Sequence, residues 1–125
     1  MDISSKPIVD ERALILKAKE ILKGNTWDGR YTVPSANLYP YQWNWDSGFV
    51  AMGFAHFDIP RAIKEMESLF EGQWENGMLP HIVFHSKKRE GYFPGPSYWQ
   101  SNKVPEASNG RYFRNYSASG SRVYS

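Results

Sequence analysis

The residues best suited to chemistry stand in one run, Tyr39-Pro40-Tyr41-Gln42-Trp43-Asn44-Trp45-Asp46. Sugar recognition needs flat apolar faces against the C–H side of a pyranose ring, and carboxylates or amides that bind paired hydroxyls. Trp43 and Trp45 supply such faces, while Gln42, Asn44 and Asp46 supply the polar groups. The run therefore predicts a carbohydrate-binding cluster.

The same residues also admit a purely structural interpretation. Asp is a common N-cap, so Asp46 can serve only to begin a helix. Indole rings have a large apolar surface, so Trp43 and Trp45 can belong to a hydrophobic core. The sequence leaves this alternative open.

Other ionisable residues give no second site. His81 and His85 are four residues apart, like two ligands on a helix, but Pro80 and the apolar run Ile82-Val83-Phe84 predict an extended segment. No metal and no cofactor is therefore expected. Asp28 and Glu75 are candidates for acids of a truncated site, but each is expected to be a solvated carboxylate in a loop.

The charge pattern excludes whole classes of partner. The formal net charge is +2, and the small basic cluster Lys87-Lys88-Arg89 is too short for a nucleic-acid surface. The expected partner is a small sugar or glycoside, with no nucleic acid and no membrane. There is no cysteine, which excludes disulfides and thiol nucleophiles but does not indicate the compartment. The segment Met1 to Lys19 has no signal-peptide pattern and is too short to span a bilayer, so a cytoplasmic protein is expected.

A helix and a long loop precede the aromatic run. From Asp10 to Lys23, apolar residues recur at helical spacing and Gly24-Asn25 follows them, which predicts an amphipathic helix. Residues 26–44 hold a glycine, two prolines and many aromatics without a sustained period. They predict a long irregular loop.

Two further helices follow the run. One begins at Asp46-Ser47, and because its apolar residues fall on nearly every side, we expect it to be buried. Asp58-Ile59-Pro60 predicts a stop and restart, and the next helix runs from Pro60 to about Trp74. It has an apolar face of Ile63, Met66, Leu69, Phe70 and Trp74 and a charged face of Arg61, Lys64, Glu65 and Glu67.

The order of these elements predicts the fold class. After a turn at 75–77, residues 78–85 form a short apolar run that can be extended, and residues 86–109 predict another loop. Helical hairpins that alternate with aromatic loops predict an all-α fold with its loops gathered at one end. A length of 125 residues fits one domain or part of one.

Several motifs, in the same order along the chain, resemble the opening third of glycoside hydrolase family 63. Within that family the sequence most resembles the subgroup of mannosylglycerate hydrolases and their bacterial glucosidase-like relatives. The resemblance covers residues 8 to about 110. The motifs are the run from Tyr39 to Phe49, Ser68-Leu69-Phe70, Gly72 to Ile82, Gly91 to Pro96, and Trp99-Gln100.

The resemblance implies an (α/α)6 barrel that hydrolyses an α-linked sugar with inversion, by means of a general acid and a general base. In the family both carboxylates come from later hairpins, so no catalytic residue is expected among these residues. The family's substrate-binding cluster maps onto Tyr39, Trp43, Asn44, Trp45, Asp46 and Tyr92. Such an incomplete barrel should leave the apolar faces of Phe49, Val50, Phe54, Leu69 and Phe70 without partners.

The resemblance stops at residue 110, and residues 111–125 form a polar tail outside the family pattern. Codons that encode Phe113 to Arg122 can, when read one base later, spell Ser-Gly-Ile-Thr-Gln-Pro-Pro-Val-Leu-Ala, which resembles the family's continuation. We therefore expect a frameshift near this point and an inactive, truncated domain. Resequencing that finds no such alternative frame would exclude the frameshift.

Two alternatives to a glycosidase segment remain open from the sequence. The aromatic cluster also suits a non-catalytic carbohydrate-binding module. If both indoles are core residues, the chain is a structural helical module.

Overall fold

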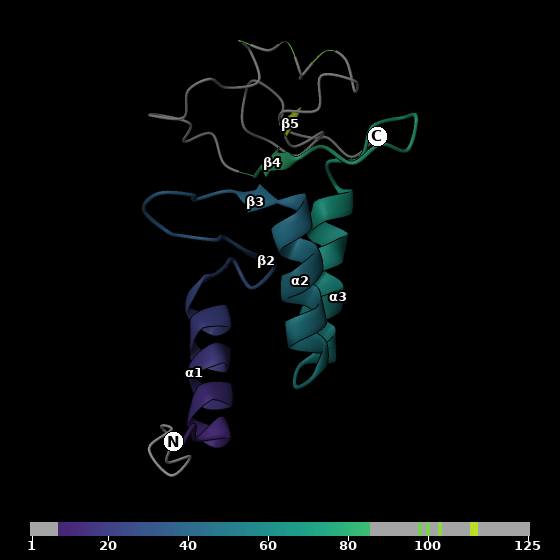
Figure 1. Cartoon of the computed structure of the whole chain (residues 1–125). Coiled ribbons are helices and arrows are strands. Elements are labelled where there is room, and N and C mark those ends of the chain that lie inside the picture. The colour runs from purple at the N-terminus through teal and green to yellow at the C-terminus, as the bar shows by residue number, and fades with distance from the viewer. Residues whose placement is uncertain (1–7, 86–97, 99, 101–102, 104–110, 113–125) are drawn as a thin grey trace, which may run out of the picture.

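The computed structural model describes residues 8–85, 98, 100, 103 and 111–112 of the chain. Its first element is helix α1 (Glu11–Gly24), which stands to one side of the other two helices in Figure 1. The Asp10 carboxylate caps α1 by accepting a hydrogen bond from the Ala13 amide at 3.2 Å. The helix predicted over 10–23 is confirmed.

A short β-hairpin follows α1. Strand β1 (Thr26–Trp27) pairs antiparallel with β2 (Tyr31–Thr32). In the turn, Asp28 and Gly29 have φ values of 55° and 64°. Two successive positive φ angles suit Asp-Gly, which is a strong hairpin signal. The prediction of an irregular loop over 26–44 is therefore wrong at its start.

Three more short strands form a sheet with the order β3-β4-β5. Strand β3 (Gln42–Trp43) pairs antiparallel with β4 (Ile82–Phe84), and β4 pairs parallel with β5 (Arg111–Tyr112). The strands lie beyond one end of the helices in Figure 1. The all-α prediction is wrong in this respect, because extended segments that run past one another pair their backbone groups. The extended segment predicted within 78–85 is confirmed.

Helices α2 (Asn44–Ala55) and α3 (Ile59–Phe70) lie side by side as a helical hairpin (Figure 1). The Asp58 carboxylate caps α3 by accepting from the Arg61 amide at 3.1 Å, and Pro60 occupies the first turn, where a missing N–H is tolerated. The predicted stop and restart is confirmed. Helix α3 ends at Phe70 rather than near Trp74, whose amide instead donates to the Met78 carbonyl at 2.9 Å.

Helix α2 is not buried on every side, contrary to the prediction. Its buried residues are Ser47, Ala51 and Phe54. Trp45, Phe49 and Met52 are exposed. A hairpin of two helices covers only one stripe of each, so the remaining apolar side chains of α2 face outward.

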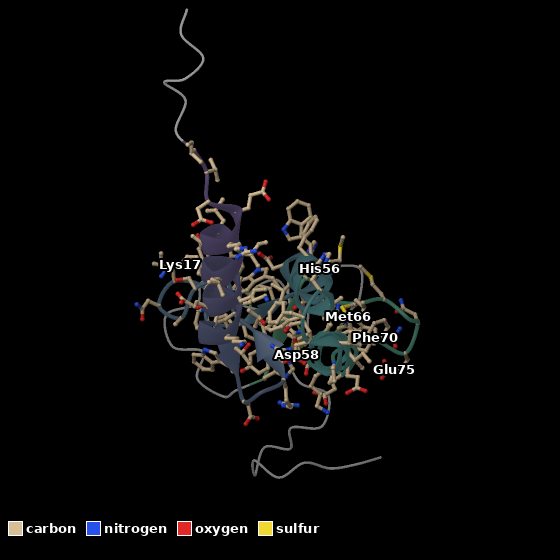
Figure 2. All side chains as sticks on the ribbon, turned by 90° about the horizontal axis from the view of Figure 1, so that it is seen from below. Lys17, His56, Asp58, Met66, Phe70 and Glu75 are labelled. Atoms are coloured by element: carbon tan, nitrogen blue, oxygen red, sulfur yellow. The ribbon has the colours of Figure 1, made fainter. Side chains whose placement is uncertain are left out.

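The expected loss of packing partners is found at two positions. Phe49 and Phe70 are exposed and Val50 is partly buried, while Phe54 and Leu69 are buried. A groove of about 680 Å³ runs between α2 and α3, with Ala51, Ala62 and Met66 among its lining residues. In Figure 2, the labelled Met66 and Phe70 lie on the side of the hairpin away from α1. Within the part of the chain that the structure describes, no helix is long and apolar enough to cross a membrane.

Replacing Gly72 with alanine should lower the free energy of unfolding by about 1–3 kcal/mol. The added Cβ would lie 2.6 Å from Val83 Cγ2, and Val83 is fully buried against Leu69. Urea unfolding followed by circular dichroism measures the loss. Gly48→Ala in α2 is the control, because its Cβ would meet no heavy atom within 4 Å. It should stabilise by about 0.5–1 kcal/mol; equal losses at both positions would contradict the steric cause.

Candidate functional site

The aromatic cluster lies where β3 leads into α2, at the sheet end of the helical hairpin (Figure 1). Tyr39 is 54% exposed and meets the half-buried Trp43 edge-on, with ring centroids 5.8 Å apart. On its other side, Trp43 packs against a buried cluster of Tyr41, Ile82 and Phe84. Trp43 is therefore packed against a buried cluster, while Tyr39 is open to solvent.

Trp45 and Asp46 stand on the first turn of α2. Trp45 is 74% exposed and meets the Phe49 ring edge-on, with centroids 5.6 Å apart. The interpretation of both indoles as core residues is therefore wrong for Trp45. Because the N-cap position belongs to Trp43, the interpretation of Asp46 as the N-cap is also wrong.

Asp46 and Asn44 provide the polar groups of the cluster. Both side chains are partly buried. The backbone N–H of Asn44 donates to the backbone carbonyl of His81 at 2.9 Å, and this bond fixes the start of α2 beside β4. No hydrogen bond joins the Asp46 carboxylate to another residue in the described range 8–85, so its oxygens can accept from a ligand.

Gln42 does not face solvent, although the sequence suggested it as a sugar contact. Its side chain is fully buried, and Nε2 donates to Ser47 Oγ at 2.9 Å and to the Glu65 carbonyl at 3.0 Å. Its Oε1 lies 2.6 Å from Nε2 of His85. Gln42 therefore belongs to the structure beneath the cluster, because strand alternation turns it inward next to Trp43.

The main feature that the sequence does not reveal is a buried carboxylate below the cluster. The Glu65 side chain is 0% exposed and accepts hydrogen bonds from Ser47 Oγ at 2.6 Å and from Thr32 Oγ1 at 2.8 Å. The Thr32 amide donates to it at 3.1 Å. A buried charge is tolerated only where such donors surround it.

Arg61 completes this buried group. Its Nη2 lies 2.7 Å from Glu65 Oε2, and its guanidinium stacks over the Phe54 ring at 4.6 Å from the centroid. Nη1 donates to the Arg30 carbonyl at 3.1 Å. Arg61 and Glu65 belong to the charged face predicted for this helix, yet both are buried, because the β-hairpin and the start of α2 cover that side of α3.

A second polar group adjoins the first. Arg30 Nη1 lies 3.2 Å from the Glu71 carboxylate, and Tyr31 stacks on His85 with ring centroids 4.2 Å apart. Burial raises the pKa of the Tyr31 hydroxyl above its ordinary value, a shift that the nearby Arg30 charge partly offsets.

This raised pKa predicts a loss of stability in alkali. Above a pH of about 10, a tyrosine in the unfolded chain releases its proton while buried Tyr31 keeps it. The unfolded state then binds fewer protons, so the free energy of unfolding falls as the pH rises toward the folded-state pKa. Tyr31→Phe should show a shallower fall than the wild type in urea titrations between about pH 9 and pH 11. Equal slopes would contradict the shift.

The remaining sequence candidates do not join the cluster. Asp28 and Glu75 lie exposed in turns, as predicted. His81 is exposed and precedes an extended β4, so it shares no helical face with His85. Tyr92 and the basic run 87–89 lie outside the described residues. The groove between α2 and α3 shares no residue with the cluster, and apart from Glu67 its lining is apolar, whereas a sugar site needs several polar groups.

The site thus combines exposed aromatic faces with an available carboxylate, at the sheet end of a helical hairpin. This layout suits a helix-rich protein that acts on carbohydrates, and comparison with known proteins gives the particular family. The model of the mannosylglycerate hydrolase MGH1-like glycoside hydrolase domain matches residues 39–124, more than half of the chain. The chain belongs to this family of glycoside hydrolases.

Individual proteins of this family are also similar to the chain. Mannosylglycerate hydrolase MGH2 of Selaginella moellendorffii is 46% identical over 99 residues, which cover 79% of this chain and 20% of that protein. The glucosylglycerate hydrolase of Mycolicibacterium hassiacum is 45% identical over 86 residues, which cover 69% and 19%. The crystal structure of the GH63 mannosylglycerate hydrolase from Thermus thermophilus with Tris and D-glycerate matches with a TM-score of 0.61 and 53% identity, covering 67% and 20%.

These comparisons confirm the resemblance to family 63 that the motifs carry. The chain spans about one fifth of the length of the relatives it matches. The division of the chain at residue 110 stays a prediction, and the family match, which continues to residue 124, gives it no support.

Proposed function

We propose that this segment supplies a sugar-binding end of a glycoside hydrolase that acts, with inversion, on an α-linked mannoside or glucoside such as mannosylglycerate. The observation that supports it best is the 74% exposed indole of Trp45 on the first turn of α2, the turn that also carries Asp46. Tyr39, Trp43 and Asn44 complete the cluster, and Tyr92 is proposed as a further contact. The names of the relatives, which specify mannosyl- and glucosylglycerate, support this substrate class.

The general acid and base are proposed to come from parts of the family domain that this segment does not cover. Among the described carboxylates near the cluster, Glu65 is sealed from solvent by its donors. Inverting hydrolysis needs two carboxyl groups on opposite sides of the scissile bond, roughly 6.5–9.5 Å apart. The open apolar faces of α2 and α3 fit a place in an (α/α)6 ring of helical hairpins, where neighbouring hairpins would cover them.

Titration of the chain with mannosylglycerate, with methyl α-mannoside as a simpler ligand, tests the proposal. We expect weak saturable changes in tryptophan fluorescence, with a Kd on the order of 1 mM, and no release of mannose. Absence of any response would contradict the sugar-binding role. Release of mannose by the purified chain would contradict the proposed origin of the acid and base.

A stand-alone binding module is the alternative. It predicts tighter binding together with a sharp, cooperative thermal transition, since such a module must fold without neighbours. The exposed apolar groove between α2 and α3 favours the glycosidase segment over this alternative.

A further inference from the structure

One carboxylate connects the two ends of the aromatic segment. Glu65 Oε1 accepts from Ser47 Oγ at 2.6 Å and lies 3.4 Å from Gln42 Nε2. Gln42 directly precedes Trp43, and Ser47 directly follows Asp46. The four residues between these contacts therefore lie on a segment held at both ends by the same side chain.

The other carboxylate oxygen of Glu65 binds groups outside the aromatic segment. Oε2 accepts from Thr32 Oγ1 at 2.8 Å and from Arg61 Nη2 at 2.7 Å. Ser47 Oγ also accepts from Gln42 Nε2 at 2.9 Å, which joins the two site contacts to each other. All members are buried, and a buried network of this kind tolerates few alternative arrangements because each lost hydrogen bond leaves a desolvated polar group.

We propose that Glu65 is a positioning residue for the sugar site, which it orients through Gln42 and Ser47 without touching the ligand. Apolar packing beneath Trp43 can adjust to small shifts. The hydrogen bonds of Glu65 are directional and fix where β3 ends and where α2 begins. They set the relative orientation of Trp43, Trp45 and Asp46. The role in sugar binding rests on the function proposed above, whereas the role in orienting the indoles does not.

A matched pair of hydroxyl deletions tests this role. Ser47→Ala removes a bond to Glu65 on the side of the site, and Thr32→Val removes one of similar length on the side of the β-hairpin. We expect Ser47→Ala to shift the indole N–H resonances of Trp43 and Trp45 and to weaken mannosylglycerate binding about tenfold. Thr32→Val should leave the indole resonances and the sugar affinity unchanged, although its free energy of unfolding should fall by about as much as that of Ser47→Ala.

Two further measurements test whether Ser47 acts through its hydrogen bond to Glu65 or only through its place next to Asp46. Ser47→Thr restores the hydroxyl and should restore both the resonances and the affinity. In a Glu65→Gln background, which is used only if it folds, Ser47→Ala should have much less effect than in the wild type. Equal effects of Ser47→Ala and Thr32→Val, or no rescue by Ser47→Thr, would overturn the positioning role. If the wild type binds no sugar, the proposed function fails and the indole resonances alone still decide the positioning role.

Discussion

Glu65→Ala should be the most destabilising single change considered for this chain, with a loss of about 3–5 kcal/mol in the free energy of unfolding. The substitution removes the acceptor for Thr32 and Ser47 and leaves the Arg61 guanidinium, only 9% exposed, without its partner at 2.7 Å. Because small domains have a total stability of only about 5–15 kcal/mol, a large part of it would be lost. Urea unfolding monitored by far-ultraviolet circular dichroism measures the change.

Glu67→Ala is the matched control for this prediction. It makes the same change on the same helix, but the Glu67 side chain is 59% exposed and pairs with Lys64 at 3.3 Å. Exposed pairs of this kind contribute little, so its loss should stay below about 1 kcal/mol. A Glu65 variant as stable as the Glu67 variant would show that the buried network contributes nothing to stability.

Asp46→Asn should weaken binding of mannosylglycerate by about tenfold to a hundredfold. The change keeps the shape of the side chain and replaces an ionised acceptor, whose hydrogen bonds are worth about 1.5–3 kcal/mol, with a neutral amide. Helix α2 should remain intact, because the described structure gives the Asp46 carboxylate no bond within residues 8–85. Titration monitored by the indole N–H resonances measures the affinity.

Asp28→Asn is the corresponding control for binding. Asp28 has a φ of 55° in an exposed turn, and asparagine tolerates this conformation. We expect its affinity for the sugar to match that of the wild type. Unchanged affinity in the Asp46 variant would remove Asp46 from the proposed site.

Local patterns in the sequence determine the helices and the place of the candidate site. Periodic apolar residues predict α1 and α3, and the capping residue Asp58 marks the restart between α2 and α3. These features depend on neighbours along the chain, so they can be read without knowing the fold. The motif around Trp43 and Asp46 likewise predicts the family, which the comparisons confirm. The ligand contacts themselves stay predictions.

Other local signals are weaker. The Asp28-Gly29 turn is visible in the sequence, but the two-residue strands around it are too short to show a period of two. The pairing of β3 with β4 joins residues about forty positions apart. Strand pairs of this kind depend on where the chain returns after the helical hairpin, and no local pattern specifies that.

Only the tertiary structure decides which polar residues lie inside. Arg61 and Glu65 are four residues apart on an amphipathic helix, a spacing that usually marks a solvated ion pair. They are buried because Thr32 and Ser47, from two other parts of the chain, come to lie over them and supply hydrogen bonds. Burial depends on what packs against a face, and this is a property of the fold rather than of the helix that carries the residues.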